Sequence, residues 1–198
     1  VVLDKTGTLT RGKPTLVRVL PFGLSQEEAL RLAAALERGS EHPLAKAVLE
    51  AAESLPQAQA EEVRALPGEG VEGRVEGRRL HLGGPALMER LGVPLPEEAK
   101  ALPEEGYTPL YLVEGTRLLA AFAVFDPPRP EAQEAVAALK ALGLKLVLLT
   151  GDHPAPARRV AEALGIPEVL AGVRPEGKVE AIRRLQAEGR KVVFVGDG

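Results

Sequence analysis

The sequence predicts an α/β fold in two parts: a doubly wound core with a parallel sheet, and an α+β insertion with an antiparallel sheet. Two short apolar runs, 144–149 and 191–195, are of the kind that a parallel sheet buries on both faces. Helical periodicity separates them, whereas residues 15–125 contain strands joined by tight turns. We therefore expect a core formed by residues 1–14 and 126–198, interrupted after its first strand by an inserted domain.

The core begins with the apolar residues 1–3 and continues, after the insertion, as alternating helices and strands. Gly143 and Gly165 follow two helical patterns, at the position where helix ends favour glycine. Ligands of open α/β sheets bind beyond the carboxyl ends of the strands, so functional residues are expected there. The predicted helices cover residues 130–142, 154–164 and 176–188.

The insertion mixes strands and helices around the predicted antiparallel sheet. Its first helix starts at Ser25, with Glu28 three residues later, which is a capping-box pattern. Pro43 stands at a natural first position of the second helix. Glu-Gly pairs at 76–77 and 114–115 predict hairpin turns. The expected strands cover 14–20, 70–76, 78–83, 110–113 and 118–125, and the other expected helices cover 43–54, 85–91 and 96–105.

Composition excludes several classes of function. The net charge of −3 provides no basic surface field, so nucleic acid is not an expected partner. The chain has no cysteine, which excludes disulfides and thiolate metal sites, and no run of 18 apolar residues that would span a membrane. Both ends read as cuts inside a longer protein. The lack of asparagine and the 17 prolines fit a thermophile, although a GC-rich genome would produce much of the same bias.

A carboxylate follows the first strand directly. Asp4 is followed by Lys5 and then by the small residues 6–8, and a turn there would lift the Asp4 side chain to the sheet edge and offer backbone N–H groups to a phosphate. Such a carboxylate can attack a phosphoryl group and form an acyl phosphate. An isolated aspartate at a strand end is more often a turn or cap residue, so the interpretation depends on its neighbours.

Further polar residues are expected at the same edge. Thr150, Gly151 and Asp152 end the 144–149 strand, and the Thr150 hydroxyl can bond a phosphate oxygen. Lys178 stands in the first turn of a predicted helix, where its ammonium group can neutralise developing charge. Asp197 follows the last strand and provides a second carboxylate for Mg²⁺. Their convergence predicts phosphoryl-transfer chemistry.

These elements resemble the signature of the haloacid dehalogenase superfamily, and residues 4–8, DKTGT, resemble the phosphorylation motif of P-type ATPases. TGD at 150–152, Pro175-x-x-Lys178 and GDG at 196–198 match the other core motifs, and DPPR at 126–129 resembles the hinge motif. The resemblance covers essentially the whole chain. It implies a phosphorylation domain of haloacid-dehalogenase type and a nucleotide-binding domain over 15–125. It also implies phosphorylation of Asp4, with Lys178, Thr150 and Asp152 as catalytic residues, Thr6 and Gly151 as further contacts of ATP, and Mg²⁺ held by Asp4, Thr6 and Asp197.

Position 6 distinguishes pumps from phosphatases of this superfamily. Its phosphatases usually carry a second aspartate two residues after the nucleophile, as general acid and base, where this chain has Thr6. Without that carboxylate, water is poorly activated and an aspartyl phosphate should persist. A persistent phosphoenzyme suits a pump that changes conformation before it is dephosphorylated. In the family, a separate actuator domain assists the dephosphorylation.

The insertion resembles the nucleotide domain of heavy-metal pumps. Ser40-Glu41-His42-Pro43 is similar to their SEHP motif, and Glu37 matches their adenine-contacting acid. The resemblance implies that Glu37 lies near the exocyclic amine of adenine and His42 near the purine ring. Gly68 and Gly70 resemble the GxG nucleotide motif, in which glycine lets the ligand approach the backbone. No Rossmann strand-turn-helix context accompanies these glycines, so a dinucleotide site is excluded.

Four other residues of the insertion and core are not assigned to the nucleotide motifs in the same way. His81 and His153 lack such a motif context and are interpreted as structural. Heavy-metal pumps commonly carry Gly-Asn in the turn after the glycine loop, whereas this chain has Gly83-Gly84. The hydrogen bonds of that asparagine are therefore lost here, although Gly83 can still contribute its backbone.

The preferred function is the cytoplasmic, ATP-hydrolysing part of an integral-membrane pump, with ATP and Mg²⁺ as cofactors. The transmembrane and actuator domains of the same pump are its expected partners. Copper is the cargo that the resemblance implies, bound outside this chain, and zinc, cadmium and cobalt stay open. A soluble phosphatase with residues 15–125 as its cap is the alternative, against which Thr6 and the SEHP motif argue. A non-catalytic nucleotide-binding module is the third possibility, against which Asp4, Lys178 and Asp197 argue.

Overall fold

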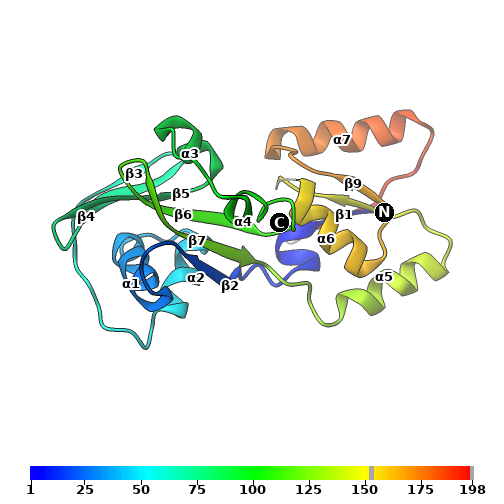
Figure 1. The fold of residues 1–198 in the computed structure, drawn as a ribbon. Coiled ribbons are helices and arrows are strands. Elements are labelled where there is room, and N and C mark those ends of the chain that lie inside the picture. Colours follow the sequence, from blue (N-terminus) through cyan, green and yellow to red (C-terminus); the bar gives the residue numbers. More distant parts are fainter. Residues whose placement is uncertain (152–153, 197–198) are drawn as a thin grey trace. The chain divides into compact units, whose positions relative to one another are not determined.

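A computed structural model describes residues 1–151 and 154–196 (Figure 1). The chain divides into two compact units, which we describe separately. Unit 1 comprises Val1–Lys13, Pro103–Gly106 and Asp126–Gly198, and unit 2 comprises Pro14–Leu102 and Tyr107–Phe125. Within the described ranges, no helix combines the length and the apolar character that crossing a bilayer requires.

Unit 1 contains a parallel sheet with the strand order β10-β1-β8-β9. Val2 pairs with Val147 on one side and with Phe194 on the other, so β1 is a central strand. Short apolar strands buried on both faces are typical of parallel sheets. The strands are β1 (Val2–Asp4), β8 (Val147–Leu149), β9 (Glu168–Leu170) and β10 (Phe194–Val195).

Helices cover both faces of this sheet, as the predicted doubly wound arrangement requires. Val2, Val147 and Leu149 pack with Ala181 and Leu185, which belong to α7. Figure 1 shows α7 on one side of the strands, with α5 and α6 on the other. The helices are α5 (Ala132–Ala141), α6 (Pro154–Leu164) and α7 (Pro175–Ala187). The prediction of an α/β core with a parallel sheet is confirmed.

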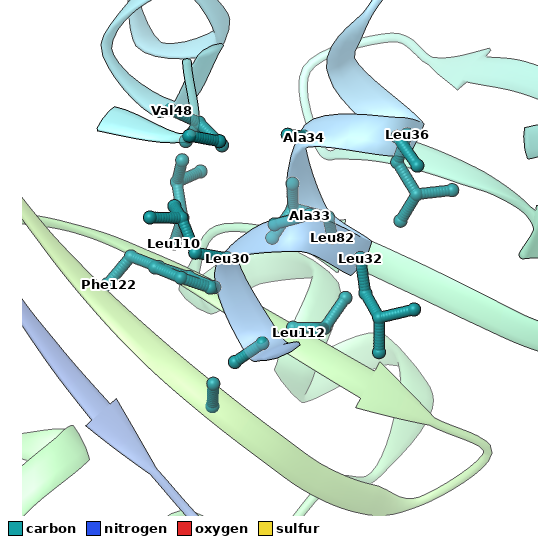
Figure 2. Packing of buried hydrophobic residues seen from close by; sticks show 14 of the residues in the cluster. Leu30, Leu32, Ala33, Ala34, Leu36, Val48, Leu82, Leu110, Leu112 and Phe122 are labelled. Carbon is teal, nitrogen blue, oxygen red and sulfur yellow. The ribbon is translucent and has the colours of Figure 1, made fainter. Parts of the chain in front are cut away.

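Unit 2 is built on an antiparallel sheet with the order β2-β7-β6-β5-β4-β3. One face packs against α1 and α2, and Figure 2 shows Leu30 and Ala33 of α1 clustered with Leu110 and Phe122 of the sheet. The opposite face carries α3 and α4 with their own apolar cluster. The strands are β2 (Thr15–Pro21), β3 (Ala60–Leu66), β4 (Gly70–Val75), β5 (Arg78–Gly83), β6 (Thr108–Glu114) and β7 (Arg117–Phe125). The helices are α1 (Gln26–Glu37), α2 (Pro43–Ala51), α3 (Pro85–Leu91) and α4 (Glu97–Lys100).

Local sequence signals explain the boundaries of several elements. The Ser25 side chain caps α1 by accepting a hydrogen bond from the Glu28 N–H at 3.1 Å. Glu76 and Gly77 both have positive φ, 52° and 77°, as a two-residue hairpin of type I′ requires. Gly143, with φ of 78°, ends α5 in the left-handed conformation.

The structure differs from the expected elements in several places, among them the strand expected over 191–195, of which only Phe194–Val195 forms β10. Strands β3 and β9 were not predicted, and α4 ends at Lys100, within the helix expected over 96–105. The strand expected over 144–149 is shortened to Val147–Leu149. Pro103 stands three residues after α4 and restricts its predecessor to extended backbone, so the helix cannot continue through it.

Candidate functional site

Asp4 ends the central strand β1, at the carboxyl edge of the parallel sheet. It pairs in register with Leu149, the last residue of β8. A tight turn, η1 (Lys5–Leu9), follows immediately, in which Thr6 is extended and Gly7 has φ of 79°. A left-handed residue is most readily glycine, so the small residues of the motif let the chain turn sharply here. The Asp4 side chain is 17% exposed, which leaves it reachable at the sheet edge.

Lys178 forms the closest described contact of the Asp4 carboxylate. Its Nζ lies 3.2 Å from Oδ1 and 3.3 Å from Oδ2 of Asp4. The lysine belongs to the first turn of α7, which begins at Pro175. The N-terminal end of a helix carries partial positive charge, so the same region favours an anion. The structure thus brings Asp4 and Lys178 together across 174 positions of sequence.

Thr150 and Gly151 lie at the same edge, directly after β8. Thr150 is 2% exposed, and its backbone is fixed on both sides: its N–H donates to Leu170 and its carbonyl accepts from Val173, each at 3.0 Å. Gly151 is exposed, and a Cβ there would meet the Val173 carbonyl oxygen at 3.2 Å. Asp152, His153 and Asp197 lie outside the described residues, so their predicted places stay predictions.

The described residues could bind Mg²⁺ only together with the phosphate groups of a substrate. Asp4 has carboxylate oxygens and Thr6 has a hydroxyl and a carbonyl oxygen, which are of the hard donor type that Mg²⁺ prefers. Within 1–151 and 154–196, no group of three or more histidine, cysteine or acidic residues could hold a metal by itself. Mg²⁺ in phosphoryl-transfer sites is usually held by one or two carboxylates together with substrate phosphates, so this donor set fits.

A hydrogen-bonded network joins the loop after Asp4 to residues 126–129. The Thr10 hydroxyl lies 2.7 Å from Oδ2 of Asp126, and the Arg129 guanidinium donates to the Gly7 carbonyl at 2.8 Å. Residues 126–129 match a hinge motif in the sequence, which does not indicate that Thr10 or Arg129 belongs to the site. The DPPR motif was a signal for Arg129, but a separation of 122 residues hid its contact with the loop.

Glu37, in unit 2, is the last residue of α1 and is only 8% exposed. Burial raises the pKa of its carboxyl group to about 7, because the charged form loses its hydration. The negative end of the helix dipole acts in the same direction. A carboxyl group with a pKa of about 7 is partly protonated at neutral pH, so it can either accept or donate a hydrogen bond. This property suits the hydrogen-bonding edge of adenine.

His42 lies five residues further on and caps α2. The His42 Nδ1 accepts a hydrogen bond from the Leu44 N–H at 3.2 Å, and the His42 backbone N–H donates to the Ser40 hydroxyl at 3.2 Å. The Ser40 N–H in turn donates to the Glu37 carbonyl at 2.9 Å. His42 is exposed, so the ring face is accessible although Nδ1 is engaged. Ser40 therefore links the backbone at Glu37 to the backbone at His42 through hydrogen bonds.

The glycine loop lies between β3 and β4. The Glu69 N–H donates to the Leu66 carbonyl at 2.9 Å, closing a turn in which Gly68 has φ of 74°. Gly70 has φ of 154°, and a Cβ there would lie 2.1 Å from the Leu82 carbonyl oxygen. A Cβ on Gly83 would lie 2.2 Å from the Glu69 carbonyl oxygen, so both positions require glycine for close backbone contact.

The two nucleotide motifs lie on neighbouring elements of unit 2. A Cβ on Gly73 of β4 would lie 3.0 Å from Leu36 Cδ2, so the last turn of α1 packs on the strand that begins at Gly70. Glu37 follows Leu36 directly. Gly84, the position that departs from the heavy-metal pattern, is the N-cap residue of α3, and its absent Cβ would meet open space.

Comparisons with known proteins agree with this geometry. The family model of haloacid dehalogenase-like hydrolases matches residues 1–198. A protein of Rhizobium meliloti, copper-transporting ATPase 1, is 43% identical over 204 residues, covering 100% of this chain and 25% of the relative. A zinc-transporting PIB-type ATPase in its E2.Pi state is similar in structure, with a TM-score of 0.77 and 38% identity, covering 100% of this chain and 32% of that one. The catalytic domain of the CPx-ATPase CopB-B has a TM-score of 0.77 and 27% identity, covering 100% and 70%.

The chain thus spans about a quarter of the length of the curated relative it matches. The resemblance to heavy-metal P-type ATPases that the DKTGT and SEHP motifs indicated is confirmed, and so is the haloacid-dehalogenase-like fold class. The chain belongs to the haloacid dehalogenase-like hydrolases, and within them it is similar to the catalytic parts of PIB-type ATPases.

Proposed function

We propose that this chain is the cytoplasmic, ATP-hydrolysing portion of a heavy-metal P-type ATPase that is phosphorylated on Asp4. The observation that carries the proposal is the Asp4 carboxylate at the carboxyl edge of the parallel sheet, with Lys178 Nζ 3.2 Å from one of its oxygens. A nucleophilic carboxylate beside a fixed cation, on a backbone turn that can receive phosphate oxygens, suits phosphoryl transfer.

The reaction follows from these residues. An Asp4 oxygen attacks the γ-phosphorus of ATP, the bond from that phosphorus to the β,γ-bridging oxygen breaks, and ADP leaves with the electron pair. Lys178 holds the attacking carboxylate in place and then balances the charge of the phosphoryl oxygens. Bound Mg²⁺ would supply Lewis-acid stabilisation of those oxygens, with Asp4, Thr6 and Asp197 as its proposed ligands.

Unit 2 is the proposed ATP-binding part. Glu37 and His42 would contact adenine, and Gly68 and Gly70 would let the nucleotide approach the backbone. The buried Glu37 carboxyl group and the exposed ring of His42, held in one turn, support this assignment. The similar CopB-B catalytic domain is described as changing conformation on nucleotide binding, which supports a nucleotide site in the corresponding part of this chain.

A pump is favoured over a soluble phosphatase. Thr6 provides no general acid or base next to the nucleophile, and the relatives found are metal-transporting ATPases. The transmembrane and actuator domains of such a pump are the proposed partners, and the transported ion would bind outside this chain. Copper is the proposed cargo because the relative of 43% identity is named for copper, although the similar zinc pump keeps zinc as the competing ion.

The proposal is tested in the full-length protein with ATP that carries a radioactive γ-phosphate. We expect an acid-stable, hydroxylamine-sensitive phosphoprotein that depends on Mg²⁺ and disappears in Asp4→Asn. Labelling that survives Asp4→Asn would contradict the mechanism. Rapid release of phosphate from a small phosphomonoester without accumulation of labelled protein would favour the phosphatase. Stimulation of labelling by monovalent copper and not by zinc is expected if copper is the cargo.

A further inference from the structure

Gly7, in the middle of the loop after Asp4, is held from both sides by side chains. Its N–H donates a long hydrogen bond of 3.4 Å to the Thr10 hydroxyl, and its carbonyl accepts from the Arg129 guanidinium at 2.8 Å. Because Gly7 has φ of 79°, a conformation that glycine adopts freely, its own backbone does little to fix these two peptide planes. The loop geometry therefore depends on Thr10 and Arg129.

Thr10 is itself fixed by Asp126. Its hydroxyl oxygen lies 2.7 Å from Oδ2 of Asp126 and 3.2 Å from the Lys5 carbonyl oxygen. A hydroxyl group has one hydrogen to donate, and the shorter distance favours Asp126 as its acceptor. Its lone pairs then face the Gly7 N–H. Thr10 is completely buried, so water does not compete for these bonds.

The same segment is anchored through its backbone. The Arg129 N–H donates to the Leu9 carbonyl at 2.7 Å, and the Arg11 N–H donates to the Pro127 carbonyl at 3.2 Å. Thr10 and Pro128 form an antiparallel bridge. Residues 126–129 are therefore hydrogen-bonded along the loop through their backbone, and Asp126 and Arg129 also contact it through their side chains.

Peptide planarity extends this support to Thr6. The Gly7 N–H and the Thr6 carbonyl belong to one peptide unit and point in opposite directions, because that unit is planar and trans. Whatever holds the Gly7 N–H therefore also orients the Thr6 carbonyl oxygen. Thr6 is two residues from Asp4 and is one of the proposed Mg²⁺ ligands. Mg²⁺ requires nearly ideal octahedral geometry, so a misdirected oxygen would weaken its binding.

We propose that Thr10, Asp126 and Arg129 are positioning residues that orient the Thr6 carbonyl for Mg²⁺. This inference rests on the proposed function, since it assigns the metal to the Asp4 site. Thr10 acts on the Thr6–Gly7 peptide directly, Asp126 acts through Thr10, and Arg129 fixes the following peptide through the Gly7 carbonyl. None of the three needs to touch the metal or the phosphate.

The first test measures metal binding without turnover. Mn²⁺ replaces Mg²⁺ in the full-length protein without ATP, and electron paramagnetic resonance follows the site that Asp4→Asn removes. Thr10→Val deletes the hydroxyl at nearly constant volume and should weaken Mn²⁺ binding about fivefold to tenfold, the equivalent of one hydrogen bond. Thr10→Ser keeps the hydroxyl and should bind as the parent does. Thr108→Val, in β6 of unit 2, is the matched control and should leave Mn²⁺ binding unchanged.

Asp126 provides a second pair of variants. Asp126→Asn can keep a carbonyl oxygen on the Thr10 hydroxyl. Its amide would replace Oδ1, which is buried without a hydrogen-bond partner among the described residues, so this variant should lose stability without losing the bond to Thr10. Asp126→Asn should therefore retain most of the Mn²⁺ affinity, whereas Asp126→Ala should lose as much as Thr10→Val. Equal losses of Mn²⁺ affinity in Asp126→Asn and Asp126→Ala would contradict the proposal that Asp126 acts through the Thr10 hydroxyl.

Amide hydrogen exchange of the metal-free protein gives an independent readout. Thr10→Val should accelerate exchange in residues 5–9 about fivefold to tenfold, and Thr10→Ser should not. If Thr10→Val folds and both binds Mn²⁺ and exchanges like the parent, the inference is wrong. If Thr10→Ser fails like Thr10→Val, packing and not the hydroxyl supports the loop. Neither measurement needs ATP, so the absence of a phosphoprotein would overturn the proposed function separately.

Discussion

Glu37 provides the most quantitative prediction, through the pH dependence of stability. Burial raises its pKa in the folded protein from 4.5 to about 7. A raised pKa means that the folded state binds the proton more tightly than the unfolded state, so the contribution to stability is greatest below pH 4.5 and is lost as the pH rises towards 7. From pH 5 to 8.5 the two pKa values correspond to a loss of about 2.5 kcal/mol.

Glu37→Gln isolates this contribution because glutamine imitates the protonated carboxyl group and does not titrate. We expect the free energy of unfolding of Glu37→Gln, measured with urea by circular dichroism, to approach that of the parent near pH 5. Between pH 5 and pH 8.5, the free energy of unfolding of the variant should increase by about 2.5 kcal/mol relative to that of the parent. Other titrating groups cancel in the comparison, since both proteins carry them.

Glu41→Gln is the matched control, four residues away and exposed. It removes one carboxyl group from the same segment without altering the buried position 37, so it shows whether the effect of Glu37→Gln is specific to that position. A difference between Glu37→Gln and the parent that stays constant from pH 5 to 8.5 would refute the raised pKa, and with it the view that Glu37 is kept near neutrality by burial. If nucleotide binding orders the surroundings of Glu37 further, excess ATP should shift the midpoint of the pH dependence.

Three further predictions concern single residues. Lys178→Met should slow phosphorylation of Asp4 about a hundredfold, as measured by rapid quench, while ATP binding stays within about twofold, because the lost cation acts on the transferring phosphoryl group. Gly70→Ala should destabilise unit 2 by about 3 kcal/mol or more in urea unfolding, since its Cβ would lie 2.1 Å from a carbonyl oxygen, whereas Gly68→Ala, in open space with φ of 74°, should cost only about 1 kcal/mol. Gly84→Asn should raise the unfolding free energy by a few tenths of a kcal/mol, because the open space at this N-cap of α3 accommodates a capping side chain.

The strands and helices that could be predicted are those whose own residues carry a local signal. Residues 144–149 are apolar enough to indicate a buried strand, and Ser25 marks the start of α1. Strand β3 has no such signal because it lies at the sheet edge, where Glu61, Glu62 and Arg64 face solvent. It forms a strand because it pairs with β4, and this pairing exists only in the assembled sheet.

The same limit applies to the site. Asp4 and Thr150 could be placed together because both follow strands of one parallel sheet, a rule of topology that sequence alone supplies. The contact between Thr10 and Asp126 spans 116 residues and depends on where the chain returns from unit 2, so no local pattern predicts it. The hinge motif indicated which segment returns there but not which carbonyl Arg129 would bind.

Glu72 shows that a sequence motif does not indicate the role of every residue in it. It lies in the glycine segment 68–73 as a charged residue and would be a natural choice for a ligand contact. In the structure it is buried between two paired strands, contacting Arg64 on one side and lying 2.9 Å from Nε2 of His81 on the other. Burial alone would raise the pKa of Glu72, but the hydrogen bond from Arg64 and the charges of His81 and Arg79 outweigh it and lower the pKa.

The carboxylate of Glu72 is therefore used within the sheet. It ties β3 and β5 to the strand that begins at Gly70, which agrees with the interpretation of His81 as structural. The register places the pair Glu72–His81 two residues from the pair Gly70–Gly83, so the polar pair stabilises the strands where the two glycines meet. The one acidic side chain within β4 is thus already paired inside the sheet.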